Sequence, residues 1–117
     1  MYRVSKRMEI SAMHRLNLNY DSPCKNSHGH NWIITVEVSG NELNENGMLI
    51  DFKKIKELIH DKLDHRNLNE VFDFNPTAEN IAKWVADVIN SSTSNLTIWC
   101  KYVKVQETEG NYAIWEE

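Results

Sequence analysis

The chain has 117 residues, of which 41% are hydrophobic and 26% are charged, a composition typical of one ordinary globular domain. Its four glycines and two prolines exclude collagen-like and low-complexity chains. Thirteen basic and 17 acidic side chains give a net charge of −4, which disfavours nucleic acid and anionic membranes as general partners. A small anionic substrate could still bind at a local basic site.

The sequence also bounds where the protein acts. Its apolar runs are far shorter than the roughly 20 residues of a membrane span. The first residues lack the apolar core of a secretory signal. Two cysteines, Cys24 and Cys100, do not make a disulfide framework. We therefore expect a single cytoplasmic domain over residues 1–117, with two free thiols and with neither a membrane nor a nucleic acid as partner.

The first part of the chain predicts two strands. Apolar side chains at every second position indicate extended structure over residues 2–14 and, most clearly, over 31–40. The intervening residues 15–30 are rich in Asn, Ser, Pro and Gly and predict a loop. Residues 44–47 predict a turn.

The middle of the chain predicts two amphipathic helices. Asp51 is a suitable cap for a helix that runs to about Leu63. Thr77 is a suitable cap for a second helix, in which apolar residues recur every three or four positions as far as Ile89. The residues between them, 64–75, predict a loop.

The last part predicts a strand pair. Residues 90–95 are all Asn, Ser or Thr and end the second helix. Residues 96–107 predict a strand, 109–111 a turn and 112–115 a short strand. The order ββααββ predicts an α+β fold with a four-stranded antiparallel sheet and both helices on one face. Another subunit is the natural cover for the opposite face.

Three histidines are candidate metal ligands. His28 and His30 flank Gly29, and residues two apart in an extended chain point the same way. His14 ends the first predicted strand, so strand pairing would bring it near them. Three imidazoles without a thiolate are typical of a zinc site that keeps its fourth position open for catalysis. For an isolated His-x-His pair, a simple polar turn is the more common explanation.

The two cysteines receive different interpretations. Cys24 lies in a predicted loop four residues before His28, where a nearby cation could ionise it into a base or nucleophile. Alternatively, it is a fourth, structural zinc ligand or an inert thiol. Cys100 lies in a predicted strand between Trp99 and Lys101, and we interpret it as a packing residue.

Two further positions carry candidate chemistry. Asp64 next to His65 can fix the tautomer of the imidazole and make it a general acid/base, although such a pair also occurs at solvated helix ends. His60, nearby, is interpreted as a surface residue. Glu107 ends a predicted strand. Its carboxylate is either merely solvated or holds a guanidine-like edge through two hydrogen bonds.

Five segments in this order resemble the 6-pyruvoyltetrahydropterin synthase / 6-carboxytetrahydropterin synthase family. The segments span most of the chain: 12–16, 24–31, 63–69, 75–80 and 105–108. The resemblance implies the tunnelling (T-) fold, in which ββααββ subunits associate through their sheets into a barrel. It also implies a homo-oligomer, most simply a hexamer of two trimers, whose active sites are shared between subunits.

The resemblance implies a role for each candidate residue. By matching motifs, these are His14, His28 and His30 as ligands of Zn²⁺, Cys24 as catalytic base, Asp64 and His65 as acid/base relay, Glu107 as the pterin anchor and Thr77 as a pterin-pocket residue.

One spacing favours a branch of the family. Three residues separate Cys24 from His28, and this short spacing resembles the 6-carboxytetrahydropterin synthases of queuosine biosynthesis, as do residues 48–52. That branch implies 7,8-dihydroneopterin triphosphate as substrate, with loss of acetaldehyde and triphosphate. The segment around Cys24 departs from the pattern in lacking a nearby glycine. There are two alternatives to this function. The protein is a 6-pyruvoyltetrahydropterin synthase, or it is a non-catalytic assembly module that binds zinc or a pterin.

Overall fold

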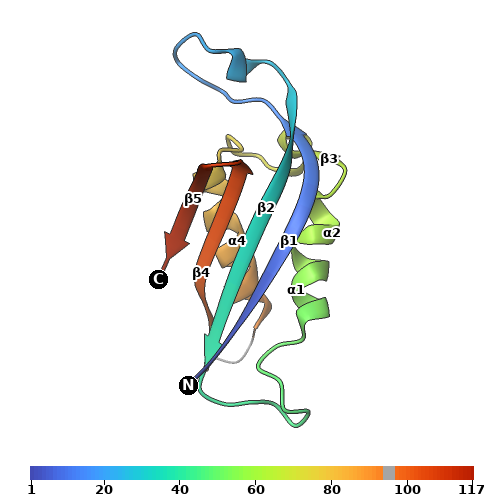
Figure 1. Cartoon of the computed structure of the whole chain (residues 1–117), viewed down its shortest axis with the longest axis vertical. Helices are drawn as coiled ribbons and strands as arrows, with labels where there is room; N and C mark the ends of the chain where they lie inside the picture. The colour runs from blue at the N-terminus through green and yellow to red at the C-terminus, as the bar shows by residue number, and fades with distance from the viewer. Residues whose placement is uncertain (94–96) are drawn as a thin grey trace.

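The computed structural model describes residues 1–93 and 97–117, which form one sheet with all of its helices on one face (Figure 1). The strand order is β3-β1-β2-β4-β5. The strands are β1 (Tyr2–His14), β2 (His28–Gly40), β3 (Arg66–Asn67), β4 (Ile98–Thr108) and β5 (Asn111–Glu116). All neighbouring pairs are antiparallel except β1 and β3, which are parallel.

The helices lie in two groups on the covered face. The short helices α1 (Phe52–Leu58), α2 (His60–Leu63) and α3 (Leu68–Val71) lie on the side of β1, whereas α4 (Ala78–Ser92) packs on β4 and β5. Asp51 caps α1 by accepting a hydrogen bond from Lys53 N at 2.9 Å. Helices α1, α3 and α4 each begin at a side chain that satisfies an otherwise unpaired backbone N–H, whereas α2 follows Ile59 without a side-chain cap.

The core lies between the sheet and these helices. In β1 and β2 the even-numbered side chains face the helices, and the register places Ile10 opposite Trp32, both at most 2% exposed. Burying each such side chain contributes roughly 1.5–3 kcal/mol to the free energy of folding. The same parity continues to the end of β1, where His14 pairs with His28. The odd-numbered side chains of β1, such as Arg7 and Glu9, are exposed, because successive side chains of a strand point to opposite faces of the sheet.

Residues 15–27 connect β1 to β2 and project beyond the sheet as an extended arm (Figure 1). A single 3₁₀ turn, η1 (Pro23–Lys25), interrupts the arm. Ser22 Oγ accepts a hydrogen bond from Cys24 N at 3.2 Å and begins that turn. The arm therefore leaves the body at His14 and returns at His28.

The structure corrects the predicted strands in two places. The sheet has five strands instead of four, because Arg66 and Asn67 pair with Ala12 and Met13 along the open edge of β1. The loop predicted for 15–30 is shorter, since β2 begins at His28. Histidine and glycine are weak strand formers, but here their backbones pair with the end of β1.

The predicted helix over 52–63 is divided at Ile59, whose φ of −116° leaves the helical range. The apolar pattern could not show this break, because it continues through it: Ile55, Ile59 and Leu63 are all buried. The loop predicted over 64–75 contains β3 and α3, since Leu68 and Phe72 are buried and give that segment a face to pack.

The other predicted elements agree with the structure. The second helix runs over Ala78–Ser92, and the last two strands form a hairpin. The predicted helix-ending residues 94 and 95 and the predicted strand start at Leu96 lie outside the described residues. The α+β class and the placement of the helices on one face are confirmed. In the part of the chain that the structure describes, no helix is both long and apolar enough to cross a membrane.

Candidate functional site

Three histidines and one glutamate converge where the arm meets the sheet. His14, His28 and His30 come from the paired ends of β1 and β2, and Glu107 comes from the neighbouring strand β4. One ligand atom from each of the four lies within 4.8 Å of the others. The imidazole centroids are 4.6–5.1 Å apart. These four residues are named the His/Glu cluster below.

Backbone carbonyls orient two of the imidazoles. His14 Nδ1 lies 2.9 Å from the carbonyl oxygen of Pro76, and His28 Nδ1 lies 2.7 Å from that of Asn26. A carbonyl oxygen only accepts, so each Nδ1 carries the proton, and in the neutral ring Nε2 is left with a free lone pair. Metal-binding histidines are commonly held in this way by a second partner on the other ring nitrogen.

Burial makes two of these imidazoles poor cations. His14 is fully buried, and burial lowers the pKa of both His14 and His30, an effect that the nearby Glu107 carboxylate only partly opposes. The Nε2 atoms of both rings are buried and lack a hydrogen-bond partner within the described structure. An unpaired buried polar atom is costly, and neutral imidazoles are the form that binds metal. The cluster therefore fits a metal ion.

Glu107 contacts both this cluster and a pocket. Its carboxylate oxygens lie 3.3 Å from His30 Nε2 and 3.9 Å from His14 Nε2. It also lines a pocket of about 520 Å³ together with Glu79 at the start of α4 and residues 110–114 of the β4–β5 hairpin. The carboxylate predicted to anchor a pterin ring is thus at the junction between the cluster and a hollow of substrate size.

The two cysteines lie in different surroundings. Cys24 is half-buried in the arm, and it is not among the residues of the His/Glu cluster. Cys100 is 1% exposed in the core, where burial raises the pKa of its thiol to about 11. Cys100 is therefore a packing residue that stays protonated at neutral pH, in agreement with its interpretation from the sequence.

Asp64 is held by the backbone of β1. Its Oδ1 accepts a hydrogen bond from Ser11 N at 2.9 Å, and Oδ2 lies 3.5 Å from Nε2 of His65. His65 N in turn donates to Ser11 O at 2.7 Å. His65 has a left-handed φ of +59°, which costs of order 1–3 kcal/mol for a non-glycine residue and is common at functional sites. His60, interpreted as a surface residue, brings its Nε2 within 3.7 Å of Asp64 Oδ2.

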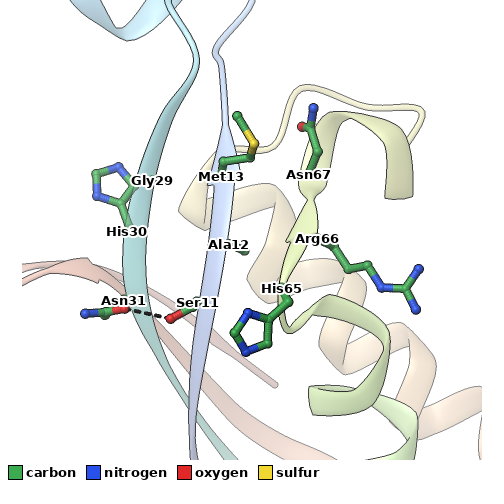
Figure 2. Close-up of a pocket in the computed structure, with 9 residues that line it drawn as sticks. All are labelled: Ser11, Ala12, Met13, Gly29, His30, Asn31, His65, Arg66 and Asn67. Atoms are coloured by element: carbon green, nitrogen blue, oxygen red, sulfur yellow. Dashed lines mark hydrogen bonds between the residues drawn. The ribbon is translucent and has the colours of Figure 1, made fainter.

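His65 lies apart from the His/Glu cluster in one chain. Figure 2 shows a pocket between β1, β2 and β3, with the His30 ring on one side of the β1–β2 pair and the His65 ring on the other. The side chain of His65 is 82% exposed, and beside it Ser11 Oγ lies 2.9 Å from Asn31 Oδ1. Within one chain the predicted acid/base pair, Asp64 and His65, is therefore not part of the His/Glu cluster.

Thr77 has a visible structural role. Its Oγ1 accepts a hydrogen bond from Asn80 N at 3.1 Å and caps α4. Two further residues were not predicted from the sequence: Pro76, whose carbonyl orients His14, and Asn69, which contacts the arm. The sequence motifs at residues 28–30 and 75–77 lie close to these contacts. The contacts themselves join residues far apart in the chain, so no local sequence pattern predicts them.

Comparisons with known proteins agree with this fold and site. The family model for 6-pyruvoyl tetrahydropterin synthase matches residues 3–117. A 6-carboxy-5,6,7,8-tetrahydropterin synthase of Bacillus subtilis is 32% identical, over 97% of this chain and 84% of that protein. A dihydroneopterin monophosphate aldolase of Pyrococcus furiosus is 35% identical, over 93% and 90%. The solved structure of Caenorhabditis elegans 6-pyruvoyl tetrahydropterin synthase has a TM-score of 0.79 and 28% identity, over 99% of this chain and 95% of that chain. The chain belongs to the 6-pyruvoyl tetrahydropterin synthase family.

Proposed function

We propose that the protein is a zinc-dependent lyase that converts 7,8-dihydroneopterin triphosphate to 6-carboxy-5,6,7,8-tetrahydropterin, with loss of acetaldehyde and triphosphate, in queuosine biosynthesis. One observation carries the proposal. The buried Nε2 atoms of His14 and His30 lie beside the Glu107 carboxylate and have no hydrogen-bond partner among the described residues. The similarity to a 6-carboxy-5,6,7,8-tetrahydropterin synthase over nearly the whole chain supports the choice of reaction.

The cluster residues divide between metal and substrate. His14, His28 and His30 would hold the ion, and backbone carbonyls orient the imidazoles of His14 and His28. Three imidazole ligands suit zinc with an open fourth position. A zinc ion bound there supplies Lewis-acid polarisation of the hydroxyl groups of the substrate side chain. Glu107 accepts hydrogen bonds from the amino-pyrimidine edge of the pterin, for which the adjacent pocket gives room. Thr77, which caps α4, directly precedes Ala78 and Glu79 in the lining of that pocket.

The remaining residues move protons. Cys24, outside the His/Glu cluster, serves as the base that takes a carbon-bound proton. His65 passes protons to and from Cys24 or the substrate oxygens, and Asp64 holds its imidazole. Because His65 lies outside the His/Glu cluster and on the other side of the β1–β2 pair from His30, the complete site would take His65 from a neighbouring subunit.

This arrangement agrees with a ring-shaped homo-oligomer, most simply a hexamer of two trimers. Over residues 1–93 and 97–117, one sheet face carries no helix, and the outer strands β3 and β5 offer edges for pairing with another chain. We further propose that residues 1–117 act as one cytoplasmic domain without a nucleic-acid or membrane partner. Light scattering of an active sample tests the assembly, and the mass of a single chain would contradict it.

The deciding experiment incubates the purified, zinc-loaded protein with 7,8-dihydroneopterin triphosphate and identifies the products by mass. Equal amounts of 6-carboxytetrahydropterin and acetaldehyde are expected. Accumulation of 6-pyruvoyltetrahydropterin without acetaldehyde would assign the other synthase reaction. A parallel incubation with dihydroneopterin monophosphate tests the activity that the Pyrococcus furiosus relative is named for. If neither pterin reacts, the protein is a non-catalytic zinc- or pterin-binding module.

A further inference from the structure

We propose that Asn69 and Asn75 are positioning residues that fix the arm, and through it Cys24, relative to the His/Glu cluster. The inference rests on the proposed function, because it gives these asparagines a role in placing the proposed base. Neither asparagine belongs to the His/Glu cluster or lines the pocket beside Glu107. Their action follows from a chain of hydrogen bonds that leads from the body of the protein to Cys24.

The first link joins Asn69 to the start of the arm. Asn69 Oδ1 accepts a hydrogen bond from Arg15 N at 2.8 Å, and Asn69 Nδ2 donates to Arg15 O at 3.0 Å. The carboxamide thus satisfies both backbone groups of one residue, as a neighbouring strand would. Asn69 is itself held by α3, because its backbone N–H donates to Asn67 Oδ1.

The second link repeats this arrangement two residues further along. Asn75 Oδ1 accepts from Asn17 N at 2.9 Å, and Asn75 Nδ2 donates to Asn17 O at 3.0 Å. The backbone of Asn75 is anchored in turn, since its carbonyl accepts hydrogen bonds from Thr77 N and Asn80 Nδ2. The two carboxamides together act as a substitute strand along one edge of residues 15–17.

The third link leads to Cys24. In extended chain, alternate residues direct their backbone groups to opposite edges. Arg15 and Asn17 face the asparagines, and Leu16 between them donates its N–H to Cys24 O at 2.8 Å. Cys24 is therefore tied to a residue that lies two positions after His14 and is locked on both sides by carboxamides.

This geometry requires asparagine. Aspartate would keep the acceptor for the arm N–H but lose the donor for the arm carbonyl, and alanine would lose both. Glutamine carries one more methylene group, which would shift the carboxamide away from the arm backbone. A displacement of about 1 Å at a reacting group can lower the rate about 10²-fold.

Asn69 is the better test position, because Asn75 adjoins Pro76, whose carbonyl orients His14. The experiment compares wild type, Asn69→Ala and Asn69→Asp as zinc-loaded oligomers. Asn90→Ala is the matched control, since Asn90 Oδ1 also accepts a backbone N–H, from Cys100, in another part of the fold. The measurements are zinc content, kcat and KM, and the rate at which iodoacetamide alkylates Cys24, followed by peptide mass. The buried Cys100 is the internal reference in wild type and the Asn69 variants, whereas for Asn90→Ala the Cys24 rate is compared directly with wild type, because Asn90 bonds the Cys100 backbone.

We expect Asn69→Ala to keep its zinc and its KM, to alkylate Cys24 several-fold faster and to lose about 10-fold or more in kcat. In alkylation rate and in kcat, Asn69→Asp should lie between Asn69→Ala and wild type. Asn90→Ala should match wild type in both of these measurements. Unchanged alkylation and kcat in folded Asn69→Ala would overturn the inference. If Asn69→Ala does not fold, Asn69→Asp decides by the same readouts. Absence of turnover in wild type would refute the proposed function, whereas the alkylation rates would still decide the role of Asn69.

Discussion

Glu107 Oε1 lies 3.3 Å from His30 Nε2, so the carboxylate predicted to bind the pterin lies against the predicted metal ligands. This contact makes two roles possible for one side chain: a fourth metal ligand or a substrate anchor. A metal site closed by four protein ligands is structural, whereas a catalytic zinc site keeps one position for water or substrate. The anchor role is the one compatible with the proposed lyase, and it makes Glu107 the most informative position to change.

Glu107→Gln should keep the metal and lose substrate binding. The three imidazoles remain, so we expect a zinc content equal to wild type by elemental analysis. The amide keeps one acceptor but loses the charge, and a hydrogen bond to a charged group contributes about 1.5–3 kcal/mol. We therefore expect kcat/KM to fall about 10- to 100-fold. Loss of zinc from this variant would identify Glu107 as a ligand instead.

His28→Ala should strip the metal while the fold remains. His28 stands at the first position of β2 and is only half-buried, so the hydrophobic core does not depend on it. We expect zinc content and lyase activity to be lost while the circular dichroism spectrum is retained. His60→Ala is the matched control for zinc content, because His60 lies outside the His/Glu cluster. Full zinc occupancy in His28→Ala would show that the cluster is not the metal site.

Cys24→Ala separates the roles of base and ligand. Since Cys24 is outside the His/Glu cluster, the variant should keep its zinc and bind substrate. Turnover should fall by about 10²–10⁴-fold, the usual size of a general-base contribution. Cys100→Ala, measured alongside, should turn over at nearly the wild-type rate. A Cys24→Ala protein without zinc would instead favour the structural-site interpretation.

The buried thiol of Cys100 gives a test of stability against pH. Burial raises its pKa from an ordinary value near 9.0 to about 11, so between these values the unfolded chain releases a proton that the folded protein keeps. Ionisation then favours unfolding, and the free energy of unfolding falls as pH rises from about 9 to 11, by roughly 2–3 kcal/mol for this one group. Cys100→Ala should lack this contribution. Parallel pH profiles for the two proteins in urea melts would contradict it.

The sequence predicted those features that have a local cause. Strand parity identifies the core side chains of β1, and it places His14 on the same face as Ile10. The capping residues Asp51 and Thr77 mark helix starts that the structure confirms. The histidine spacing brings His28 and His30 together because β2 extends back to include both.

Features that depend on long-range register could not be predicted in the same way. The approach of Glu107 to the cluster follows from the pairing of β4 with β2, which sets Gln106 opposite Ile33. Strand β3 exists only because residues 66–67 meet the open edge of β1. The pairing of Asn69 with Arg15 joins residues 54 apart in the chain, and no periodicity marks either of them.

The positions of His65 and His30, on opposite sides of the β1–β2 pair in Figure 2, lead to a test of shared sites. If each site combines the metal ligands of one subunit with His65 of another, His28→Ala and His65→Ala are each inactive as pure oligomers. In a mixed oligomer, an interface can pair intact ligands from the His65→Ala chain with intact His65 from the His28→Ala chain. Such an interface forms one fully wild-type site. Unfolding, mixing and refolding the two variants should therefore restore part of the activity, and the restored fraction should depend on the mixing ratio.

A mixture of His28→Ala with Cys24→Ala is the comparison, because both changes lie between β1 and the start of β2. If the His28→Ala and His65→Ala mixture stays inactive while mass measurements show mixed oligomers, each site lies within one chain.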